Sequence, residues 1–465
     1  MGTSTRKRGL AVLVALLATV AAGVPATPAA AQQAPWRPVP PGPAPVVNPL
    51  TGFIPYAGSY STFPYSMEWF YLPVNAVMSG PDRLDWSAVE SQLNAIAARG
   101  HQAAFRFYLD YPGKPSGVPR FLLDGGLVTH SYDDYGNDGI SVSPDYDDPA
   151  LDTALDTFIA AFGHRYDGDP RIGFIQLGLI GFWGEWHTYP YDGWAKPENW
   201  LASAAEQARV VNAYTSAFRR TRLQVRYPGA DNAAAPVGYH DDSFAVETLP
   251  GPGWHFMDKM TQAGATGKWL TQSIGGELRP EIQGCIFDAP ADCPVIEDFA
   301  DNDFPGGVAQ THVSWLLNQY AFAPGYTGGN YDRALAGAQS MGYRLQATGV
   351  RTTVDGRRHE LGVDVRMQDL GVAPFYYDWP VQIAAVDKHG RIAKTWTTPW
   401  RLTTVTPQAA AQFSTRLPLR DLRPGAYTLV LRAANPMPNG VPLRFANAGQ
   451  DQTLTGWLTL GGIRL

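Results

Sequence analysis

Residues 172–187 read IGFIQLGLIGFWGEWH, an apolar stretch that leads into a glutamate between two tryptophans. The apolar part, residues 172–181, is typical of a buried strand, and the string that follows it begins a loop. In barrels of parallel strands, the loops at the carboxyl ends of the strands carry the function. This stretch therefore predicts both a barrel strand and a functional position at Glu185.

Further short apolar segments lie on both sides of this stretch, and helical patterns separate most of them. Strands are predicted at residues 52–56, 67–74, 103–110, 172–181, 223–227, 237–241, 268–274 and 312–319. Helices are predicted at residues 86–99, 149–164, 200–220 and 255–263. Strands that alternate with helices pair in parallel, and this set predicts a (β/α)8 TIM-like barrel over residues 48–340. No helix fits between the first two strands, and residues 312–319 are equally compatible with a helix.

The pattern changes in the last part of the chain, residues 341–465. Leu361, Val363, Val365 and Met367 alternate with polar residues, as in a strand with one buried face. Turn signals follow at residues 387–390 and 424–425, and no helical pattern of useful length is present. This region therefore predicts an antiparallel β-sandwich. The pattern leaves open whether its aromatic residues pack against the barrel or contact a ligand.

The composition limits the classes of function. The chain has 465 residues, of which 17% are charged and 12% aromatic, and a formal net charge of -6. Such a chain buries a large core, which excludes general disorder, and it lacks the basic face that a nucleic-acid partner requires. Its 14 Trp and 22 Tyr suit flat apolar ligands, a class that includes sugars. Nucleotide-binding loops, a lipase elbow and a zinc-protease helix are absent from the sequence, so we expect neither a cofactor nor a metal.

The first residues predict a secretory signal peptide over residues 1–31. Arg6, Lys7 and Arg8 form a positive region, residues 10–22 are apolar, and Ala29 to Ala31 supply a cleavage site. The apolar run is too short to cross a bilayer, and no other long apolar run follows. We therefore expect an exported, extracellular protein without a membrane span. Residues 32–47 are rich in proline and predict an extended lead-in.

Two cysteines, Cys285 and Cys293, lie eight positions apart. In the oxidising environment that export implies, such a pair predicts a disulfide. Two thiols alone make a poor metal site, so we expect the bridge to hold one local loop.

Two glutamates predict acid–base chemistry. Trp183 and Trp186 flank Glu185; apolar rings raise the pKa of a carboxyl group, as a general acid requires, and they also offer faces to sugars. The alternative is that Glu185 pairs with an arginine and that the tryptophans belong to the core. Glu277 follows the predicted strand at residues 268–274 and two glycines, which permit close approach of a ligand. Glu281 is its rival, and either can be an ordinary loop glutamate.

Other polar residues lie at predicted strand ends and are expected to bind substrate or to support the glutamates. They are Arg106, Asp110, His187, Arg226, Tyr239, His240 and Asp241. Arg106 and Asp110 share one side of a strand, so the arginine is expected to hold a carboxylate or to brace the barrel. His187 follows the WGEW string directly, which suits a residue that orients Glu185. The spacing around His240 does not suit a metal site.

The strings NPLTGF, FRFYLDYP, IQLGLIGFWGEWH, GYHDDSF, GGE and FANAGQD resemble those of a family of secreted bacterial proteins of unknown function. The resemblance covers nearly all of the chain after residue 47, and it implies a glycosidase-like barrel with a β-sandwich tail. That family is similar to the clan of retaining (β/α)8 glycosidases. The similarity implies that Glu185 is the acid/base and Glu277 the nucleophile. Gly184 stands where the clan has an asparagine.

These observations predict a secreted carbohydrate-active hydrolase that cleaves glycosidic bonds with two glutamates and retains configuration. Its partner would be an oligo- or polysaccharide. The alternatives are a carbohydrate-binding barrel without catalysis and a cell-surface scaffold. Carboxyl groups about 5–5.5 Å apart favour retention, and groups about 6.5–9.5 Å apart favour inversion. The sequence does not encode the sugar, the linkage, endo or exo action, or the oligomeric state.

Overall fold

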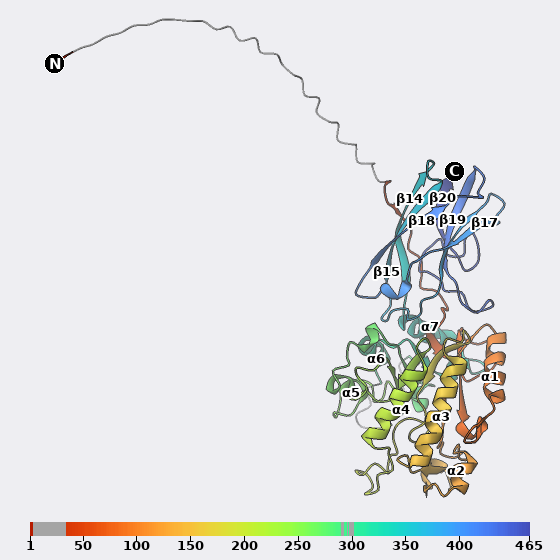
Figure 1. The fold of residues 1–465 in the computed structure, drawn as a ribbon, viewed down its shortest axis with the longest axis vertical. Helices are drawn as coiled ribbons and strands as arrows, with labels where there is room; N and C mark the ends of the chain where they lie inside the picture. The colour runs from red at the N-terminus through yellow and green to blue at the C-terminus, as the bar shows by residue number, and fades with distance from the viewer. Residues whose placement is uncertain (3–33, 290–292, 295, 297–301) are drawn as a thin grey trace. The chain divides into compact units, whose positions relative to one another are not determined.

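The computed structural model describes residues 1–2, 34–289, 293–294, 296 and 302–465 (Figure 1). Apart from residues 1–2, the predicted signal peptide lies outside the described residues. Residues Trp36–Leu465 form one compact unit. Within the described part of the chain, none of the helices is both long and apolar enough to cross a bilayer.

Parallel strands form a barrel, as the sequence predicts. In chain order they are β2 (Gly52–Ile54), β3 (Met67–Pro73), β6 (Gln102–Tyr108), β9 (Ile172–Gln176), β10 (Arg222–Val225), β11 (Gly238–Phe244), β12 (Ile274–Leu278) and β13 (Trp315–Leu317). From β3 to β13 each barrel strand pairs with the next one in sequence, and β13 pairs with β2. The ring closes next to β2, where the amide of Trp69 donates to the carbonyl of Pro55 at 2.8 Å and the amide of Ala57 donates to Trp69 at 2.7 Å. The (β/α)8 fold class is therefore confirmed.

Amphipathic helices connect most of these strands. They are α1 (Ser87–Ala98), α2 (Arg120–Asp124), α3 (Pro149–Tyr166), α4 (Ala204–Ala217), α5 (Phe256–Gln262), α6 (Phe304–Thr311) and α7 (Gly328–Ser340). Asp148 caps α3 by accepting from the amide of Ala150 at 2.7 Å, and Pro149 occupies the first turn. Figure 1 shows α3 and α4 side by side. Their close approach requires Gly163, because a β-carbon there would lie 2.5 Å from Cβ of Ala217.

One predicted strand is wrong. Residues 268–274 do not form a strand, because Lys268–Leu270 is a short 3-10 helix and β12 begins only at Ile274. Gly275 and Gly276 lie inside β12 and not after it. A β-carbon on Gly276 would lie 2.0 Å from the carbonyl oxygen of Asp241, and one on Gly275 would lie 2.4 Å from the Trp315 ring. The glycines therefore serve close packing of strands, and Glu277 lies on the strand itself.

The C-terminal region contains two four-stranded antiparallel sheets. One has the order β1 (Arg37–Pro38), β14 (Leu345–Asp355), β15 (Glu360–Asp369), β18 (Ala411–Pro418). The other has the order β17 (Ile392–Thr397), β16 (Val381–Val386), β19 (Ala426–Ala433), β20 (Leu458–Arg464). Val363 and Val365 of the first sheet share one apolar core with Ile383 and Leu431 of the second. The barrel is thus followed by the β-rich domain that the alternation predicts.

Aromatic residues of this β-rich domain contact the barrel. The hydroxyl of Tyr377 donates to the carbonyl of Gly173 at 2.6 Å, and that of Tyr376 donates to Trp269 at 2.5 Å. Both acceptors lie at or before the amino-terminal ends of barrel strands, the end opposite to the loops that carry function in such folds. These tyrosines therefore attach the two parts of the chain to each other.

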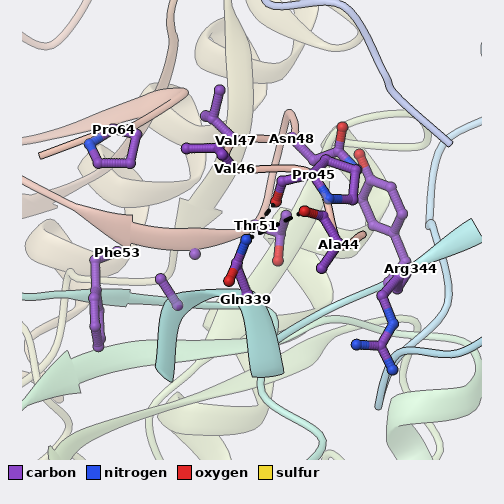
Figure 2. Close-up of a pocket in the computed structure, with 13 residues that line it drawn as sticks. Ala44, Pro45, Val46, Val47, Asn48, Thr51, Phe53, Pro64, Gln339 and Arg344 are labelled. Atoms are coloured by element: carbon purple, nitrogen blue, oxygen red, sulfur yellow. Dashed lines mark hydrogen bonds between the residues drawn. The ribbon is translucent and has the colours of Figure 1, made fainter. Parts of the chain in front are cut away.

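The proline-rich lead-in is also fixed to the rest of the protein. Arg37–Pro38 pair with β14 as strand β1. Further along, the Gln339 side chain of α7 donates to the carbonyls of Ala44 and Pro45 at 3.3 and 3.2 Å (Figure 2). The small pocket in Figure 2 lies between the lead-in, the start of β2 and the end of α7. The lead-in is therefore a strap that contacts both the barrel and the β-rich domain.

The predicted disulfide is present. Cys285 and Cys293 are bonded, with their Cα atoms 5.2 Å apart. The bridge closes one loop after β12, as the short spacing predicts.

Candidate active site

Arg106 occupies the centre of the barrel mouth. On β6 the sequence Phe-Arg-Phe alternates, so that Phe105 and Phe107 pack outward against Phe162 of α3, at 5.9 and 5.3 Å between ring centroids. Strand geometry therefore turns the Arg106 side chain toward the barrel interior, where it is only 1% exposed.

The Arg106 guanidinium joins four strands and loops. Its Nη1 donates to Asp242 Oδ2 at 2.7 Å and to Gln176 Oε1 at 2.8 Å. Its Nη2 donates to Glu185 Oε1 at 2.5 Å and to the Tyr71 hydroxyl at 3.0 Å. Charge-assisted bonds of this kind are strong and directional. Arg106 therefore positions both Glu185 and Asp242 around one point.

Strand β11 divides its polar residues between its two sides. His240 and Asp242 face the interior, where His240 Nδ1 lies 2.8 Å from Asp242 Oδ1. Asp241 accepts from Thr248 Oγ1 at 2.6 Å on the other side. Burial alone would raise the pKa of Asp242, but His240 and Arg106 outweigh that effect and lower it. Asp242 is therefore an ionised partner of Arg106.

Glu185 lies on a loop whose backbone is tightly folded. Trp183 and Trp186 both have left-handed backbone angles, with φ of 52° and 56°. A β-carbon on Gly184 would lie 2.2 Å from the carbonyl oxygen of Gly178, so this position accepts no asparagine or other side chain. The Glu185 side chain is 18% exposed, and its Oε2 lies 3.7 Å from His187 Nε2. The loop therefore holds Glu185 at the mouth, with one oxygen on Arg106 and the other toward His187.

The two tryptophans beside Glu185 differ in their surroundings. Trp183 is half-buried, and its ring lies 4.8 Å from Tyr135 and 6.5 Å from Tyr111. Trp186 is 4% exposed, and its indole nitrogen donates to the carbonyl of Leu177. Trp183 therefore offers a ring at the mouth, whereas Trp186 belongs to the core and offers no face to a ligand, contrary to expectation.

Glu277 lies in a small recess beside Arg106. The lining residues are Trp69, Tyr71, Arg106, Gln176, Asp242, Gly276, Glu277 and Leu317. Among the described residues, the Glu277 carboxyl has no hydrogen-bond or ion-pair partner. Burial raises the pKa of Glu277 well above its ordinary value, and the charges of Asp242 and Glu185 raise it further, while Arg106 opposes them. Glu281 is half exposed and pairs with Arg279 at 2.9 Å, so Glu277 is the glutamate that reaches Arg106's neighbourhood.

Asp110 does not join Arg106, although the two share a strand. Its Oδ1 accepts from the hydroxyls of Tyr132 and Ser141, both at 2.6 Å. Burial raises the pKa of Asp110 to about 6, and these two hydroxyls oppose the rise. The Asp110 backbone bridges to Phe182, just before Trp183. Asp110 therefore lies behind the Glu185 loop and attaches it to the segment after β6.

Tyr239, Asp241 and Arg226 lie behind the mouth as well. Tyr239 is fully buried, and its hydroxyl donates to Asn232 Oδ1 at 2.8 Å, so its ring is not the stacking surface we expected. Arg226 is 4% exposed and lies 3.4 Å from Asp241 Oδ1. This pair connects β10 to β11 and gives both residues a bracing contact.

Three partners of Arg106 were not among the expected site residues. They are Tyr71, Gln176 and Asp242. The alternation of β11 is a signal that could have found Asp242, because it shares a side with His240. The register between strands decides the contacts of Tyr71 and Gln176, and the linear sequence carries no signal for it.

The arrangement supplies two carboxyl groups in different states. Glu185 is paired with a permanent cation, and Glu277 lacks such a partner among the residues described. In the described ranges no group of three or more His, Cys, Asp or Glu side chains is arranged to hold a metal ion. The site therefore presents two carboxyl groups with different partners, one bonded to Arg106 and one whose pKa is raised.

Comparisons with known proteins give a weak likeness of fold. No protein-family model matches the sequence, and no curated protein matches it. Endo-glycoceramidase II from Rhodococcus sp. is similar with a TM-score of 0.38 and 13% identity, over 80% of this chain and 97% of that chain. An endo-beta-1,4-mannanase from Thermotoga petrophila is similar with a TM-score of 0.34 and 8% identity, over 83% and 95%. Likenesses at this level carry no argument about substrate or mechanism.

Proposed function

We propose that this protein is an exported carbohydrate-active hydrolase that cleaves glycosidic bonds with Glu185 and Glu277. The observation that carries the proposal is the convergence of both side chains on Arg106. Glu185, from the loop after β9, bonds to Arg106 at 2.5 Å, and Glu277, from β12, lines the same recess as that arginine. Glycoside hydrolysis uses two carboxyl groups that flank the scissile bond, and Arg106 is the residue that both of these glutamates have as a neighbour.

Aromatic rings around the mouth support a carbohydrate ligand. Tyr56 is 37% exposed and Tyr135 is 47% exposed, and Trp183 and Tyr111 lie beside them as half-buried rings. The charges of Glu185, Glu277 and Arg106 all affect the pKa of Tyr111, whose ring lies 5.5 Å from that of Tyr71 between centroids. Rings of this kind provide apolar faces with polar tips, which suits the faces of sugars.

Export is part of the proposal. Residues 1–31 have the features of a signal peptide, and the Cys285–Cys293 disulfide suits an oxidising compartment. We propose cleavage after Ala31, which leaves the strap, the barrel at residues 48–340 and the β-rich domain at residues 341–465 in the mature protein.

The test is a screen of the purified protein against a panel of polysaccharides and oligosaccharides. Glu185→Gln and Glu277→Gln should each reduce turnover by about 10³-fold or more, because each removes a group needed for bond cleavage. Glu281→Gln is the matched control, since Glu281 follows the same strand but is half exposed and bonds to Arg279. Full activity in both Glu185→Gln and Glu277→Gln would contradict the proposal.

One observation favours a second candidate, a carbohydrate-binding barrel without catalysis. Glu185 forms an ion pair with Arg106, and the sequence leaves open the alternative that Glu185 has this structural role. A binding barrel would retain labelled oligosaccharide in affinity electrophoresis without releasing product. Its affinity would fall when Trp183 is replaced by Ala and would persist in Glu185→Gln.

A further inference from the structure

The two carboxyl groups of the site are not equivalent, and the difference bears on their roles. Glu185 Oε1 lies 2.5 Å from the guanidinium of Arg106, a side chain that is 1% exposed and always charged. The other oxygen, Oε2, lies 3.7 Å from His187 Nε2, beyond hydrogen-bond distance. Glu185 thus has one oxygen bonded to Arg106 and one oxygen that makes only a long contact with His187.

Glu277 is surrounded by groups that disfavour its ionised form. Asp242 on β11 and Glu185 on the loop after β9 are negative neighbours, and Glu281 adds a weaker effect. Arg106 on β6 is the cation nearby, but Asp242 and Glu185 already bond to it. Tyr56, which follows β2, and Tyr71 on β3 are also near the pair. The charges of both glutamates help to raise the pKa of each tyrosine.

These surroundings make the two carboxyl groups unequal. A carboxylate gains from a nearby cation, whereas a carboxyl group that is buried beside other carboxylates keeps its proton. Burial and the two carboxylates raise the pKa of Glu277 well above its ordinary value. The ion pair with Arg106 therefore sets Glu185 apart from Glu277, which lies beside Asp242 and Glu185.

We propose that Glu277 is the proton donor and Glu185 the nucleophile, the reverse of the roles that the family resemblance implies. The assignment rests on the proposed function and adds the role of each glutamate at the same site. It follows from the ion pair that anchors Glu185 and from the carboxyl group of Glu277, which has no bonding partner in the described part of the chain.

The reaction balances in two steps. Glu277 gives its proton to the glycosidic oxygen, the bond from that oxygen to the anomeric carbon breaks, and Glu185 Oε2 forms a bond to that carbon. Glu277, now a carboxylate, then takes a proton from water while the water oxygen attacks the anomeric carbon. The bond to Glu185 breaks, and the sugar leaves with its original configuration.

The first experiment traps the covalent intermediate in the wild-type protein. The probes are 2,4-dinitrophenyl 2-deoxy-2-fluoroglycosides of glucose, galactose and mannose in both anomeric forms. After digestion, mass spectrometry should find the fluorosugar on the peptide that contains Glu185. An adduct on Glu277 would overturn the assignment, and so would hydrolysis of a substrate with inverted configuration.

The second experiment separates the two roles by variants. Dinitrophenolate leaves without a proton, so Glu277→Ala should still release dinitrophenolate in a rapid first burst and then turn over slowly, because the second step lacks its base, while turnover of the natural linkage should fall about 100-fold or more. Azide should accelerate Glu277→Ala and give a glycosyl azide of retained configuration. Glu185→Ala should show neither effect. Azide rescue of Glu185→Ala with retention would contradict the assignment.

The two proposals fail in different ways. Absence of turnover by the wild-type protein on the whole panel would contradict the proposed function itself. Turnover that both glutamates support, with the adduct on Glu277, would leave the proposed function standing and would contradict only the assignment of roles.

Discussion

Two glutamates on the barrel strands, Glu68 on β3 and Glu277 on β12, show how surroundings decide the use of one residue type. Glu68 is fully buried and accepts from Arg99 Nε at 2.8 Å, from Arg99 Nη2 at 2.5 Å, from the amide of Gly58 at 2.9 Å, and lies 2.8 Å from His101 Nδ1. Glu277 has no such partner among the described residues. The satisfied carboxylate holds the fold together, and the unsatisfied one is available to a ligand.

The pKa values of Glu68 and Glu277 move in opposite directions because the neighbours of the two carboxyl groups differ. Burial alone would raise the pKa of Glu68, but the bonds from Arg99, His101 and Gly58 outweigh it and lower the pKa. At Glu277, burial acts together with Asp242 and Glu185, so the pKa rises. Four substitutions test this contrast.

The largest effect on stability is expected for Asp242→Asn. Asp242 is buried and bonds to both Arg106 and His240, so the substitution leaves a fully buried guanidinium without one of its anions. Breaking a buried pair costs about 3–5 kcal/mol of the free energy of unfolding, measured by urea denaturation. Arg106→Met should cost less in the Asp242→Asn background than alone, because the two residues are coupled. A loss below about 1 kcal/mol would show that this ion pair is not a structural element.

Glu68→Gln should cost about 2–3 kcal/mol, because bonds to a charged group are lost and the amide cannot accept from all four donors. The lowered pKa of Glu68 means that its contribution is present above the unfolded value of 4.5 and is lost as the pH falls through the folded value. The difference between wild type and variant, measured by urea denaturation, should therefore shrink below about pH 4. A difference that is constant from neutral to acid pH would contradict the ionic role.

Asp110→Asn tests an intermediate case, a carboxyl group with two donors on one oxygen and none on the other. Burial raises its pKa from 3.8 to about 6, so the folded state binds the proton more tightly. Wild-type stability should then fall as the pH rises through that window, and the variant should lack about 2 kcal/mol of this fall. Thermal midpoints of both proteins between pH 4 and pH 7 provide the measurement. Parallel curves would mean that Asp110 does not titrate there.

The smallest effect is expected for Glu277→Gln, within about 0.5 kcal/mol at neutral pH. A neutral amide replaces a carboxyl group whose pKa is raised and which has no bonding partner among the described residues. Glu281→Gln, a substitution of a half-exposed residue on the following turn, serves as the control in urea denaturation. Destabilisation of Glu277→Gln by about 2 kcal/mol or more would show that its carboxylate stabilises the fold as Glu68 does.

Short apolar segments that alternate with helical patterns predicted most of the barrel. Alternation along one strand predicted that Arg106 and Asp110 share a side, but Asp110 bonds to Tyr132 and Ser141 and not to Arg106. Gly275 and Gly276 misled the same reasoning. Paired glycines usually mark a loop, but here they permit close contact with Trp315 and with the backbone of β11. Contacts of this kind between strands are not visible in the linear sequence.

The candidate site was predictable in part. The WGEW string correctly marks the loop that carries Glu185, but it does not distinguish Trp183 from Trp186. Only the folded chain shows that the Trp186 ring is buried and donates to the carbonyl of Leu177. The partners of Arg106 come from β3, β9 and β11, and the barrel register brings them together. Residue types suggested the chemistry, whereas only the folded chain shows that Glu185 and Asp242 pair with the same arginine, Arg106.

The strap has a consequence for how the chain matures. Its first strand, Arg37–Pro38, emerges early during synthesis, yet its partner Val350 on β14 follows the whole barrel sequence. Strand β1 therefore cannot pair with β14 until most of the chain has been synthesised. We expect this pairing to form late in folding. An amino-terminal tag should therefore be separated from the strap by a spacer.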